Sequence, residues 1–401
     1  MPPTPPSLPP FGREMTYLKR SVMRELIKVI ARPGVISLAS GLPASELLPV
    51  DEFRQCLDAV LHRDGPKALQ YGPPYEPLQS WIAEYMRSRG VACDPDQVFI
   101  TNGAQQGLTL VSRLFLDPGD AAVTEAITFT GIQQVTKGRG AAVRTIPTDL
   151  VTGADVDALE AAFARLPRPR LAALIPDFHN PLGVSISVEK RRRAAQLAAT
   201  YGVPLIEDDP YSSLRFEGDP RPPIKAFDEA EFVFYLGSFS KMLAPAMRLG
   251  WIIAPKAVLP RLTVLRESFD LETSALIQRA VAEFVRSGML DEHLKRFNAA
   301  NRERRDALLA ALDEHLGDVA QWTRPEGGLF VWLTLPEGVD AWELLPKAVE
   351  RNVAFVPGAA FAVEGGHANT MRLNFSSVRP EQMPQAVEIL AEVIKDQIPG
   401  H

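Results

Sequence analysis

From about Gln97 onward, short apolar runs alternate with stretches of helical spacing. Seven runs are rich in valine, isoleucine, leucine and alanine: 98–101, 121–126, 141–147, 171–177, 204–209, 232–240 and 249–255. They are almost continuously apolar, which is typical of strands buried on both faces of a parallel sheet. Strands that alternate with helices favour an α/β fold, so we predict a mostly parallel seven-stranded sheet between helical layers. The helix expected at 188–202 should turn its alanines inward and its arginines outward.

A second, smaller set of strands follows a long charged helical stretch at about 256–317. The runs GLFVWLTL, NVAFVPG and TMRLNFS predict a small C-terminal α+β domain. Six of the first ten residues are prolines, which predicts an extended arm, and helical spacing predicts a helix from Tyr17 to Ile30. We therefore expect an N-terminal arm and helix (1–45), a large domain (46–290) and a small domain (291–401).

Composition limits the class of protein further. With 46% hydrophobic residues, the 401-residue chain can bury a large core, which excludes a disordered protein or a small stapled scaffold. A net charge of −6 argues against a nucleic-acid-binding surface. Cys56 and Cys93 have no metal-ligand spacing and cannot form a disulfide framework, which fits a reducing cytoplasm. No apolar run approaches the ~18 residues of a membrane span, so we expect a cytoplasmic enzyme with no membrane, nucleic-acid or metal partner.

In open α/β sheets, ligands bind at the carboxyl ends of the strands, so the residues after each run are candidates for chemistry. Lys241, in the sequence Ser238-Phe239-Ser240-Lys241, follows an apolar strand. Desolvation there would lower the pKa of its amine, which could then form a Schiff base with a carbonyl. The two serines and Arg248 would suit a phosphate. The alternatives are a surface lysine in a turn and an S-x-x-K serine hydrolase, whose further S-D-N and K-T-G motifs are absent.

Asp208 ends another apolar run, in the sequence IEDDPY. Adjacent strand residues point to opposite faces, so Asp208 and its acidic neighbours cannot converge on one metal ion. A single buried carboxylate would need a cation, and a protonated ring nitrogen would serve; the alternative is a solvated acidic turn. Asn180 and His179, in PDFHNPLG, follow a further strand, where the first is typical of a turn before proline and the second of a structural neighbour.

Gly103, Ala104 and Gln105 join a strand to a helix, where backbone N–H groups form an anion site. Neither a Walker A loop nor a G-x-G-x-x-G motif is present. Phe129 follows the next strand, where its ring could cover a flat ligand or pack in the core. Arg372 lies within an otherwise apolar strand, and a ligand carboxylate is its natural partner.

A lysine amine, a carboxylate, an aromatic face, a phosphate cradle and a carboxylate-binding arginine together describe a pocket for pyridoxal phosphate and an amino acid. From about Tyr17 to the C-terminus, the order and spacing of the motifs resemble the fold-type I, class I/II aminotransferases, specifically the 2-aminoadipate and kynurenine aminotransferase-like branch. The most specific motifs are S-x-S-K-x-x-x-P-x-x-R-x-G (238–250), HNP-x-G (179–183), DDPY (208–211), SLASGLP (37–43) and RLNFS (372–376).

This resemblance implies a pyridoxal-phosphate-dependent aminotransferase. It would move an amino group between an L-amino acid (2-aminoadipate, glutamate, aromatic or branched aliphatic) and a 2-oxo acid such as 2-oxoglutarate. By the same resemblance, Lys241 bears the cofactor and moves the Cα proton, and Asp208 pairs with the ring nitrogen. Asn180 and Tyr211 bind the ring oxygen.

The resemblance also assigns the remaining contacts. Phe129 stacks on the ring, and the phosphate is held by Gly103, Ala104, Gln105, Ser238, Ser240 and Arg248. Tyr71 reaches the phosphate in the other subunit of a homodimer with shared active sites. The substrate-binding residues are Arg372 and Asn180 at the α-carboxylate, Gly41, and Arg24 for a distal carboxylate.

The chain departs from the family pattern at two places. Ala104 stands where a serine is frequent, which removes a hydroxyl donor but keeps the backbone amide. The loop EAITFTG around Phe129 lacks the usual proline and tyrosine. Two alternatives use the same pocket: a pyridoxal-phosphate lyase or decarboxylase, and a transcription regulator with an upstream winged helix. About forty residues precede the GLP segment, and we expect too little room there for a DNA-binding module.

Overall fold

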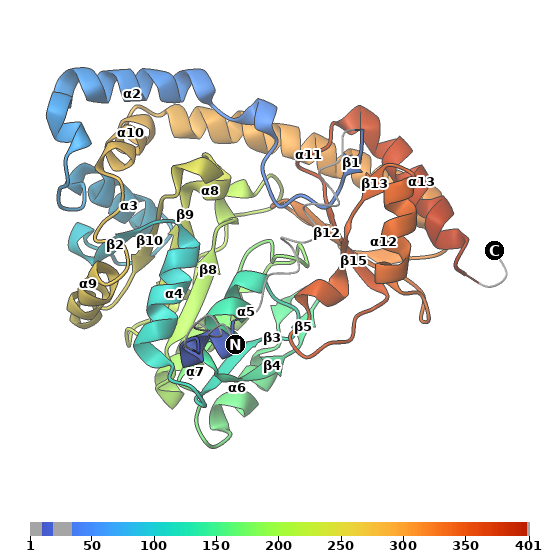
Figure 1. Ribbon diagram of the computed structural model, residues 1–401, viewed down its shortest axis with the longest axis horizontal. Coiled ribbons are helices and arrows are strands. Elements are labelled where there is room, and N and C mark those ends of the chain that lie inside the picture. The colour runs from blue at the N-terminus through green and yellow to red at the C-terminus, as the bar shows by residue number, and fades with distance from the viewer. Residues whose placement is uncertain (1–9, 19–33, 399–401) are drawn as a thin grey trace, which may run out of the picture.

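The computed structural model describes residues 10–18 and 34–398. Figure 1 shows a large domain of blue, green and yellow elements beside a small domain of orange and red elements. The N-terminal helix expected from Tyr17 to Ile30 falls mostly outside the described residues, as do the first nine residues of the expected arm.

The seven predicted runs form one seven-stranded sheet in the large domain. Its strands, in chain order, are β2 (Val98–Thr101), β3 (Ala121–Glu125), β4 (Ala142–Ile146), β7 (Leu171–Leu174), β8 (Leu205–Asp209), β9 (Val233–Ser238) and β10 (Gly250–Ile253). Their spatial order is β2-β10-β9-β8-β7-β3-β4, in which β10 is antiparallel to both neighbours and the other pairs are parallel. The prediction of a mostly parallel α/β sheet is confirmed.

Helices cover both faces of this sheet because its apolar side chains alternate between two cores. Leu171 and Ala173 of β7 contribute to one core, whereas Ala172 and Leu174 contribute to the other. The helices of the large domain are α2 (Val50–Asp64), α3 (Glu76–Ser88), α4 (Ala104–Phe115), α5 (Thr130–Thr136), α6 (Val156–Ala164), α7 (Val188–Tyr201), α8 (Phe239–Met242), α9 (Leu259–Glu267) and α10 (Ala275–Arg286).

Helix α7 corrects one detail of the sequence analysis. Its alanines Ala194, Ala195 and Ala198 are buried as predicted, but Arg191 is fully buried instead of facing outward. Its guanidinium forms a bidentate ion pair with Asp177, at 2.8 and 2.9 Å, which compensates the charge. Helical spacing cannot show such a pairing, because the partner lies in a loop outside the helix.

The small domain contains a four-stranded antiparallel sheet of order β11-β12-β15-β14. Its strands are β11 (Gln321–Trp322), β12 (Phe330–Thr334), β14 (Val356–Pro357) and β15 (Thr370–Asn374), and its helices are α12 (Ala341–Glu350) and α13 (Met383–Lys395). The 28-residue helix α11 (Met289–Leu316) runs along the top of Figure 1 from the large domain toward α13. Strand β1 (Ile36–Ser37) pairs in parallel with β13 (Val353–Ala354), so a segment from before the large domain adds to the small one. The boundaries at 45/46 and 290/291 stay predictions.

Short elements connect these parts. A two-stranded ribbon is formed by β5 (Thr148–Asp149) and β6 (Gly153–Ala154). The 3₁₀ helices are η1 (Arg13–Thr16), η2 (Ser45–Leu47), η3 (Gly65–Leu69), η4 (Pro95–Gln97), η5 (Lys137–Arg139), η6 (Ser212–Leu214), η7 (Ile224–Phe227), η8 (Pro245–Met247), η9 (Lys256–Val258), η10 (Gly358–Phe361) and η11 (Pro380–Gln382).

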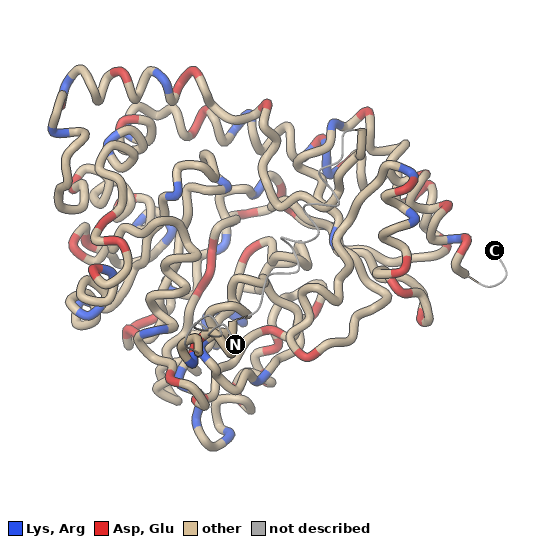
Figure 2. The backbone as a smooth tube through the Cα atoms, viewed as in Figure 1, with Lys and Arg blue, Asp and Glu red and all other residues tan. Residues whose placement is uncertain are grey.

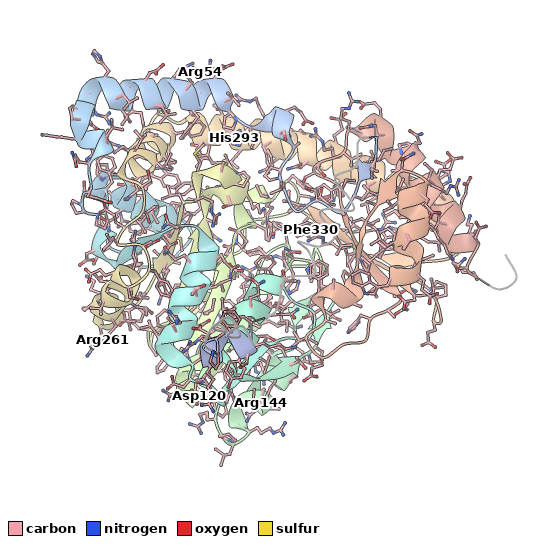
Figure 3. The ribbon with its side chains drawn as sticks, viewed as in Figure 1. Arg54, Asp120, Arg144, Arg261, His293 and Phe330 are labelled. Atoms are coloured by element: carbon pink, nitrogen blue, oxygen red, sulfur yellow. The ribbon has the colours of Figure 1, made fainter. Side chains whose placement is uncertain are left out.

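Acidic and basic residues are interspersed along the whole backbone, as Figure 2 shows. In Figure 3, Phe330 lies where the two domains meet, whereas Arg54, Arg144 and Arg261 lie at the periphery. Within residues 10–18 and 34–398, no helix combines the length and apolar character that crossing a membrane requires. In the same ranges, no three His, Cys, Asp or Glu side chains gather so that they could hold a metal ion.

Candidate active site

Lys241 lies directly after β9, at the carboxyl edge of the large sheet. Ser238 caps the short helix α8, since its Oγ accepts a hydrogen bond from the backbone N–H of Ser240 at 3.1 Å. The Nζ atom of Lys241 donates a hydrogen bond to the carbonyl oxygen of Gly41 at 2.7 Å. Burial, together with the charges of Arg372 and Arg248, lowers the pKa of Lys241 to about 8. A neutral amine is therefore available near physiological pH.

Asp208, at the end of β8, faces away from the two acidic residues beside it. Those two carboxylates have their own partners on the opposite face: Glu207 accepts from the backbone N–H groups of Ile224 and Lys225, and Asp209 accepts from Arg89, Tyr235 and Ser212. Asp208 is buried, and its Oδ1 has no hydrogen-bond partner among the described residues. Burial and the charge of Asp209 raise the pKa of Asp208 to about 7. Such a buried carboxylate needs a cationic partner, and the protonated ring nitrogen of a ligand would provide one.

Three side chains on different elements form a hydrogen-bonded row beside the lysine. The hydroxyl of Tyr211 accepts a bond from Nδ2 of Asn180 at 3.3 Å, and Oδ1 of Asn180 accepts one from Nη1 of Arg372 at 3.0 Å. Burial raises the pKa of Tyr211 and lowers that of Arg372 to about 10. The Arg372 guanidinium lies 4.3 Å from the ring centre of Phe330 and 5.0 Å from that of Phe361. The two rings hold this cation in place at the junction of the domains.

The segment that contains Gly41 passes next to this row. The backbone oxygens of Ala39 and Ser40 accept hydrogen bonds from Nη2 of Arg372 at 2.8 and 3.2 Å. A Cβ atom at Gly41 would lie 4.0 Å from the same nitrogen. Residues 39–41 therefore bridge Arg372 and Lys241 through their backbone carbonyl groups.

The turn before α4 has the features of a phosphate cradle. Gly103 has a φ of +81°, and a Cβ there would lie 2.9 Å from Nη2 of Arg248, so a side chain at this position would clash. The same Nη2 donates to the carbonyl oxygen of Asn102 at 2.9 Å. The first N–H groups of a helix have no partner within it, so the amides of Ala104 and Gln105 are suited to an anion.

Phe129 lies beside this turn at the start of α5. Its half-buried ring and the side-chain oxygen of Gln105 both press on Gly131, where an added Cβ would collide with both. Nε2 of Gln105 also donates to the carbonyl oxygen of Gly131 at 3.4 Å. The fold thus brings the candidate ring-stacking residue next to the candidate phosphate-binding helix start.

One candidate residue lies apart from this cluster, and another falls outside the described residues. Tyr71 is 82% exposed on the surface of the large domain. Arg24 lies outside the described residues, so its expected contact with a distal carboxylate stays a prediction. The remaining candidates gather at one edge of the sheet, in agreement with the rule that ligands bind at strand carboxyl ends.

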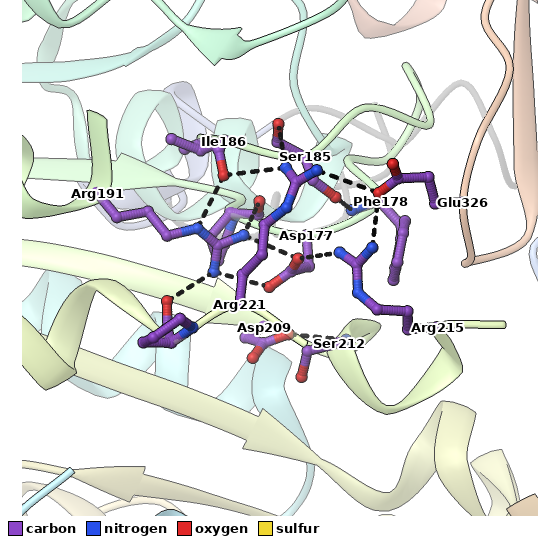
Figure 4. Close-up of polar contacts among 12 residues, drawn as sticks. Asp177, Phe178, Ser185, Ile186, Arg191, Asp209, Ser212, Arg215, Arg221 and Glu326 are labelled. Carbon is purple, nitrogen blue, oxygen red and sulfur yellow. Dashed lines mark hydrogen bonds and ion pairs between the residues drawn. The ribbon is translucent and has the colours of Figure 1, made fainter. Parts of the chain in front are cut away.

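The loop that carries Asn180 is held in place by a partly buried network of charged side chains, shown in Figure 4. Asp177 accepts from Arg191 and, at 3.3 Å, from Arg215, while Arg215 and Arg221 both bind Glu326 of the small domain. His179, in the same loop, lies 3.0 Å from Glu125 through its Nε2 atom. This His–Glu contact agrees with a structural role for His179, and the network links the loop to both domains.

Several residues of the site were missed by the sequence analysis. Phe330 and Phe361 enclose Arg372, and Asn102 binds Arg248, yet none of the three lies in a motif singled out above. The pair Gly327-Gly328, separated from Phe330 by Leu329, was a usable signal, because both glycines pack against Phe178 without room for a Cβ. Asn102 directly follows the run 98–101, but its contact with Arg248, 146 residues away, is not indicated by the sequence around it.

The residues present fit pyridoxal phosphate. Asp208 Oδ1 is buried and unpaired within the described residues, Gly103 leaves a backbone cradle beside Arg248, and Lys241 offers an amine of lowered pKa. These are, in turn, a partner for a ring N–H⁺, a site for a phosphate and an attachment point for an aldehyde.

Comparisons with known proteins agree with this chemistry. The family described as aminotransferase class I and II matches residues 33–390. The chain is 40% identical over 395 residues to an aromatic-amino-acid aminotransferase of Thermococcus litoralis, covering 97% of this chain and 94% of the relative. It is 39% identical over 391 residues to a 2-aminoadipate transaminase of Thermus thermophilus, covering 96% of each.

A solved structure shows the same relationship. The α-aminoadipate aminotransferase of Thermus thermophilus, complexed with N-(5′-phosphopyridoxyl)-L-leucine, superposes with a TM-score of 0.89 at 37% identity, covering 96% of this chain and 97% of that one. The chain therefore belongs to the class I and II aminotransferases, which are fold-type I pyridoxal-phosphate enzymes. Within this family it falls in the 2-aminoadipate and kynurenine aminotransferase-like branch, and its cofactor is pyridoxal 5′-phosphate.

Proposed function

We propose that this aminotransferase exchanges the amino group of an L-amino acid with a 2-oxo acid such as 2-oxoglutarate. Its amino donors would be 2-aminoadipate, glutamate, and aromatic or branched aliphatic amino acids. The observation that carries this proposal is the hydrogen-bonded row Tyr211–Asn180–Arg372. Its arginine donates to the carbonyl oxygens of residues 39 and 40, and Lys241 donates to that of the next residue, Gly41. An amino acid bound there has its carboxylate at the arginine and its Cα near the lysine amine.

Each residue then has a defined task. Arg372 binds the α-carboxylate through its planar fork, and Asn180 supports that geometry. Lys241, neutral above about pH 8, would hold the cofactor at its aldehyde carbon and would move the proton of Cα. Asp208 keeps a proton on the ring nitrogen, and Tyr211 binds the ring oxygen. When bound, pyridoxal phosphate supplies a conjugated ring that takes up the electron pair left on Cα.

The phosphate end is held by a different set of groups. Its anionic oxygens would lie at the amides of Ala104 and Gln105 after the turn at Gly103, with the hydroxyls of Ser238 and Ser240 and the guanidinium of Arg248 around them. Phe129 would cover one face of the ring. The support for this set is that helix α4 begins at the sheet edge next to Arg248, where its dipole favours an anion.

We also propose a cytoplasmic homodimer with shared active sites. Large apolar side chains are exposed on two neighbouring segments of the large domain: Leu69, Tyr71, Phe269 and Leu271. A hydrogen bond from the backbone N–H of Gly72 to Glu272 joins these segments. Such a patch is suited to a second copy of the chain, and Tyr71 would reach the phosphate bound there. Two unpaired cysteines, Cys56 and Cys93, support a reducing compartment.

A panel of amino acids mixed with 2-oxoglutarate or pyruvate tests the substrates. We expect keto-acid formation that requires the acceptor, with Lys241→Ala as the inactive control. Release of ammonia or carbon dioxide without an acceptor, and no amino transfer, would contradict the proposed substrates and favour a lyase or decarboxylase activity.

A further inference from the structure

The segment between α9 and α10 carries two carboxylates that bind different parts of the large domain. Asp270 accepts hydrogen bonds from the side-chain amides of Gln106, at 2.5 Å, and of Asn102. Both amides belong to the turn and first helical residues of the phosphate cradle. Because the carbonyl oxygen of Asn102 also binds Arg248, Asp270 fastens the cradle of its own chain.

Glu272, two residues further on, binds elsewhere. Its Oε1 and Oε2 accept from the backbone N–H of Gly72 at 3.1 and 3.3 Å. Gly72 directly follows Tyr71, which is 82% exposed and is therefore not part of a hydrophobic core. On the C-terminal side of this tyrosine, the segment is attached to the large domain at Gly72, through the Glu272 carboxylate, and at Tyr75, whose N–H donates to Gln278.

The backbone between the two acids turns at Leu271, where the N–H of Glu272 donates a hydrogen bond to the carbonyl oxygen of Asp270 at 2.6 Å. Leu271 has a φ of +62°, a left-handed conformation that is unfavourable for a leucine and lets the flanking side chains diverge. Arg266 connects this segment to β2, since it donates hydrogen bonds to the carbonyl oxygen of Ile100 at 2.9 Å and to the Thr273 hydroxyl at 2.7 Å. One segment thus joins the phosphate cradle to the part of the chain that carries Tyr71.

We infer that Asp270 and Glu272 are positioning residues for two different active sites. Asp270 orders the phosphate cradle of its own chain, whereas Glu272 holds Tyr71 for the cofactor phosphate of the other subunit. This inference rests on the proposed sharing of sites through Tyr71. It predicts that, in a mixed dimer, a substitution of Asp270 weakens cofactor binding at the site of its own chain (in cis). A substitution of Glu272, two residues away, weakens cofactor binding at the site of the other chain (in trans).

Mixed dimers in which one chain carries Lys241→Ala separate an effect in cis from an effect in trans. Only one site per dimer, called the live site, then attaches the cofactor covalently. In the first arrangement, Glu272→Ala and Lys241→Ala lie on different chains, so the live site receives Tyr71 from a chain with intact Glu272. In the second, both substitutions lie on one chain, so the live site is completed by Tyr71 of a chain that lacks the Glu272 contact. The readout is the fraction of live chains that carry borohydride-reduced cofactor at each pyridoxal phosphate concentration, by mass spectrometry of the intact chains.

We expect the second arrangement to need about tenfold more cofactor than the first, as for a weakened hydrogen bond to a charged group. The first should match a wild-type/Lys241→Ala dimer. Asp270→Ala should give the reverse pattern. Glu272→Gln should restore affinity, because its amide oxygen can still accept from Gly72. If the alanine variant does not fold, Glu272→Asp, which keeps the charge but shortens the reach, takes its place.

An effect of Glu272→Ala in cis, in both arrangements alike, or in neither would overturn the inference. Tyr71→Phe in the same two arrangements tests the underlying shared site separately. If Tyr71→Phe acts in trans while Glu272→Ala does not, the shared site stands and only the positioning role fails. If Tyr71→Phe acts in cis or has no effect, the shared site itself is wrong.

Discussion

Lys241 and Gly41 are 200 residues apart in sequence, yet the lysine amine donates a 2.7 Å hydrogen bond to the glycine carbonyl oxygen. The two residues before Gly41 accept hydrogen bonds from Arg372 through their carbonyl groups. One short backbone segment therefore bridges the candidate amine and the candidate carboxylate-binding group. This bridge joins the segment after β1, the residues after β9 and the middle of β15 in one site.

The lowered pKa of Lys241 predicts the pH dependence of cofactor attachment. Below about pH 8 the amine is mostly protonated and cannot attack an aldehyde. The rate at which apoenzyme takes up pyridoxal phosphate should therefore rise with pH up to about 8 and then level off, measured by stopped-flow absorbance. Arg372→Met removes one of the charges that lower this pKa and should move the rise to higher pH. A rate unchanged from pH 6 to 10 would contradict the assignment, and Lys241→Ala should retain no borohydride-reducible cofactor.

Asp208→Asn should have opposite effects on turnover and on stability. Turnover should fall on the order of a hundredfold or more, because an amide cannot hold a proton on the ring nitrogen. The folded apoenzyme raises the pKa of this carboxyl from 3.8 to about 7, so the folded state binds more protons than the unfolded state between these values. Ionised Asp208 is thus destabilising above pH 7, and this cost disappears as the pH falls below about 4.

The stability of the apoenzyme checks the same residue independently. At pH 8, Asp208→Asn should raise the free energy of unfolding by about 1–4 kcal/mol, measured by urea denaturation. The gain should shrink as the pH is lowered toward 4. Near-normal turnover with bound cofactor, or a less stable apoenzyme at pH 8, would remove Asp208 from its proposed role.

Arg372→Lys tests the carboxylate-binding row. Lysine keeps the charge but not the planar fork that contacts Asn180 and lies between Phe330 and Phe361. Loss of a hydrogen bond to a charged group is worth about 1.5–3 kcal/mol, so kcat/KM should fall about ten- to a hundredfold. Arg379→Lys, at an exposed position, is the matched control and should change little. Equal activity of both variants would place the substrate carboxylate elsewhere.

Arg24→Ala tests the substrate class. If Arg24 reads a distal carboxylate, kcat/KM for glutamate, 2-aminoadipate or 2-oxoglutarate should fall about ten- to a hundredfold. Leucine and phenylalanine, which have no distal charge, serve as internal controls and should lose much less. An equal loss for both classes would mean that Arg24 only supports the fold.

Arg191→Met should destabilise the protein through the Asp177 network. Removing this cation leaves a buried carboxylate with only the weaker 3.3 Å contact to Arg215, at a cost of about 3–5 kcal/mol. Arg193→Met on the same helix breaks only exposed ion pairs with Asp157 and Glu160, and should cost less than about 1 kcal/mol. Urea unfolding of the holoenzymes measures both changes, and similar values for the two variants would contradict the role of the buried network.

The amino-acid sequence by itself determined the seven strands of the large sheet, because most of these strands, which are 4 to 6 residues long, are buried on both faces and lie within apolar runs; the edge strand β4 is the more exposed exception. It also determined which residues follow those strands. Lys241, Asp208, Asn180 and Gly103 could be singled out locally, since ligand chemistry at strand ends requires particular side chains at particular points.

Only the tertiary structure decided which other residues contact these candidates and hold them in place. Arg191 lies on a face that its polarity predicts to be exposed, and its burial depends on Asp177 in another element. Glu272 and Gly72 are likewise 200 residues apart, and nothing near either residue in the sequence indicates their contact. A hydrophobic pattern records whether a position is buried, but a hydrogen bond or ion pair depends on which distant group the fold brings beside it. For that reason the catalytic candidates could be predicted from sequence, and the residues that hold them in place could not.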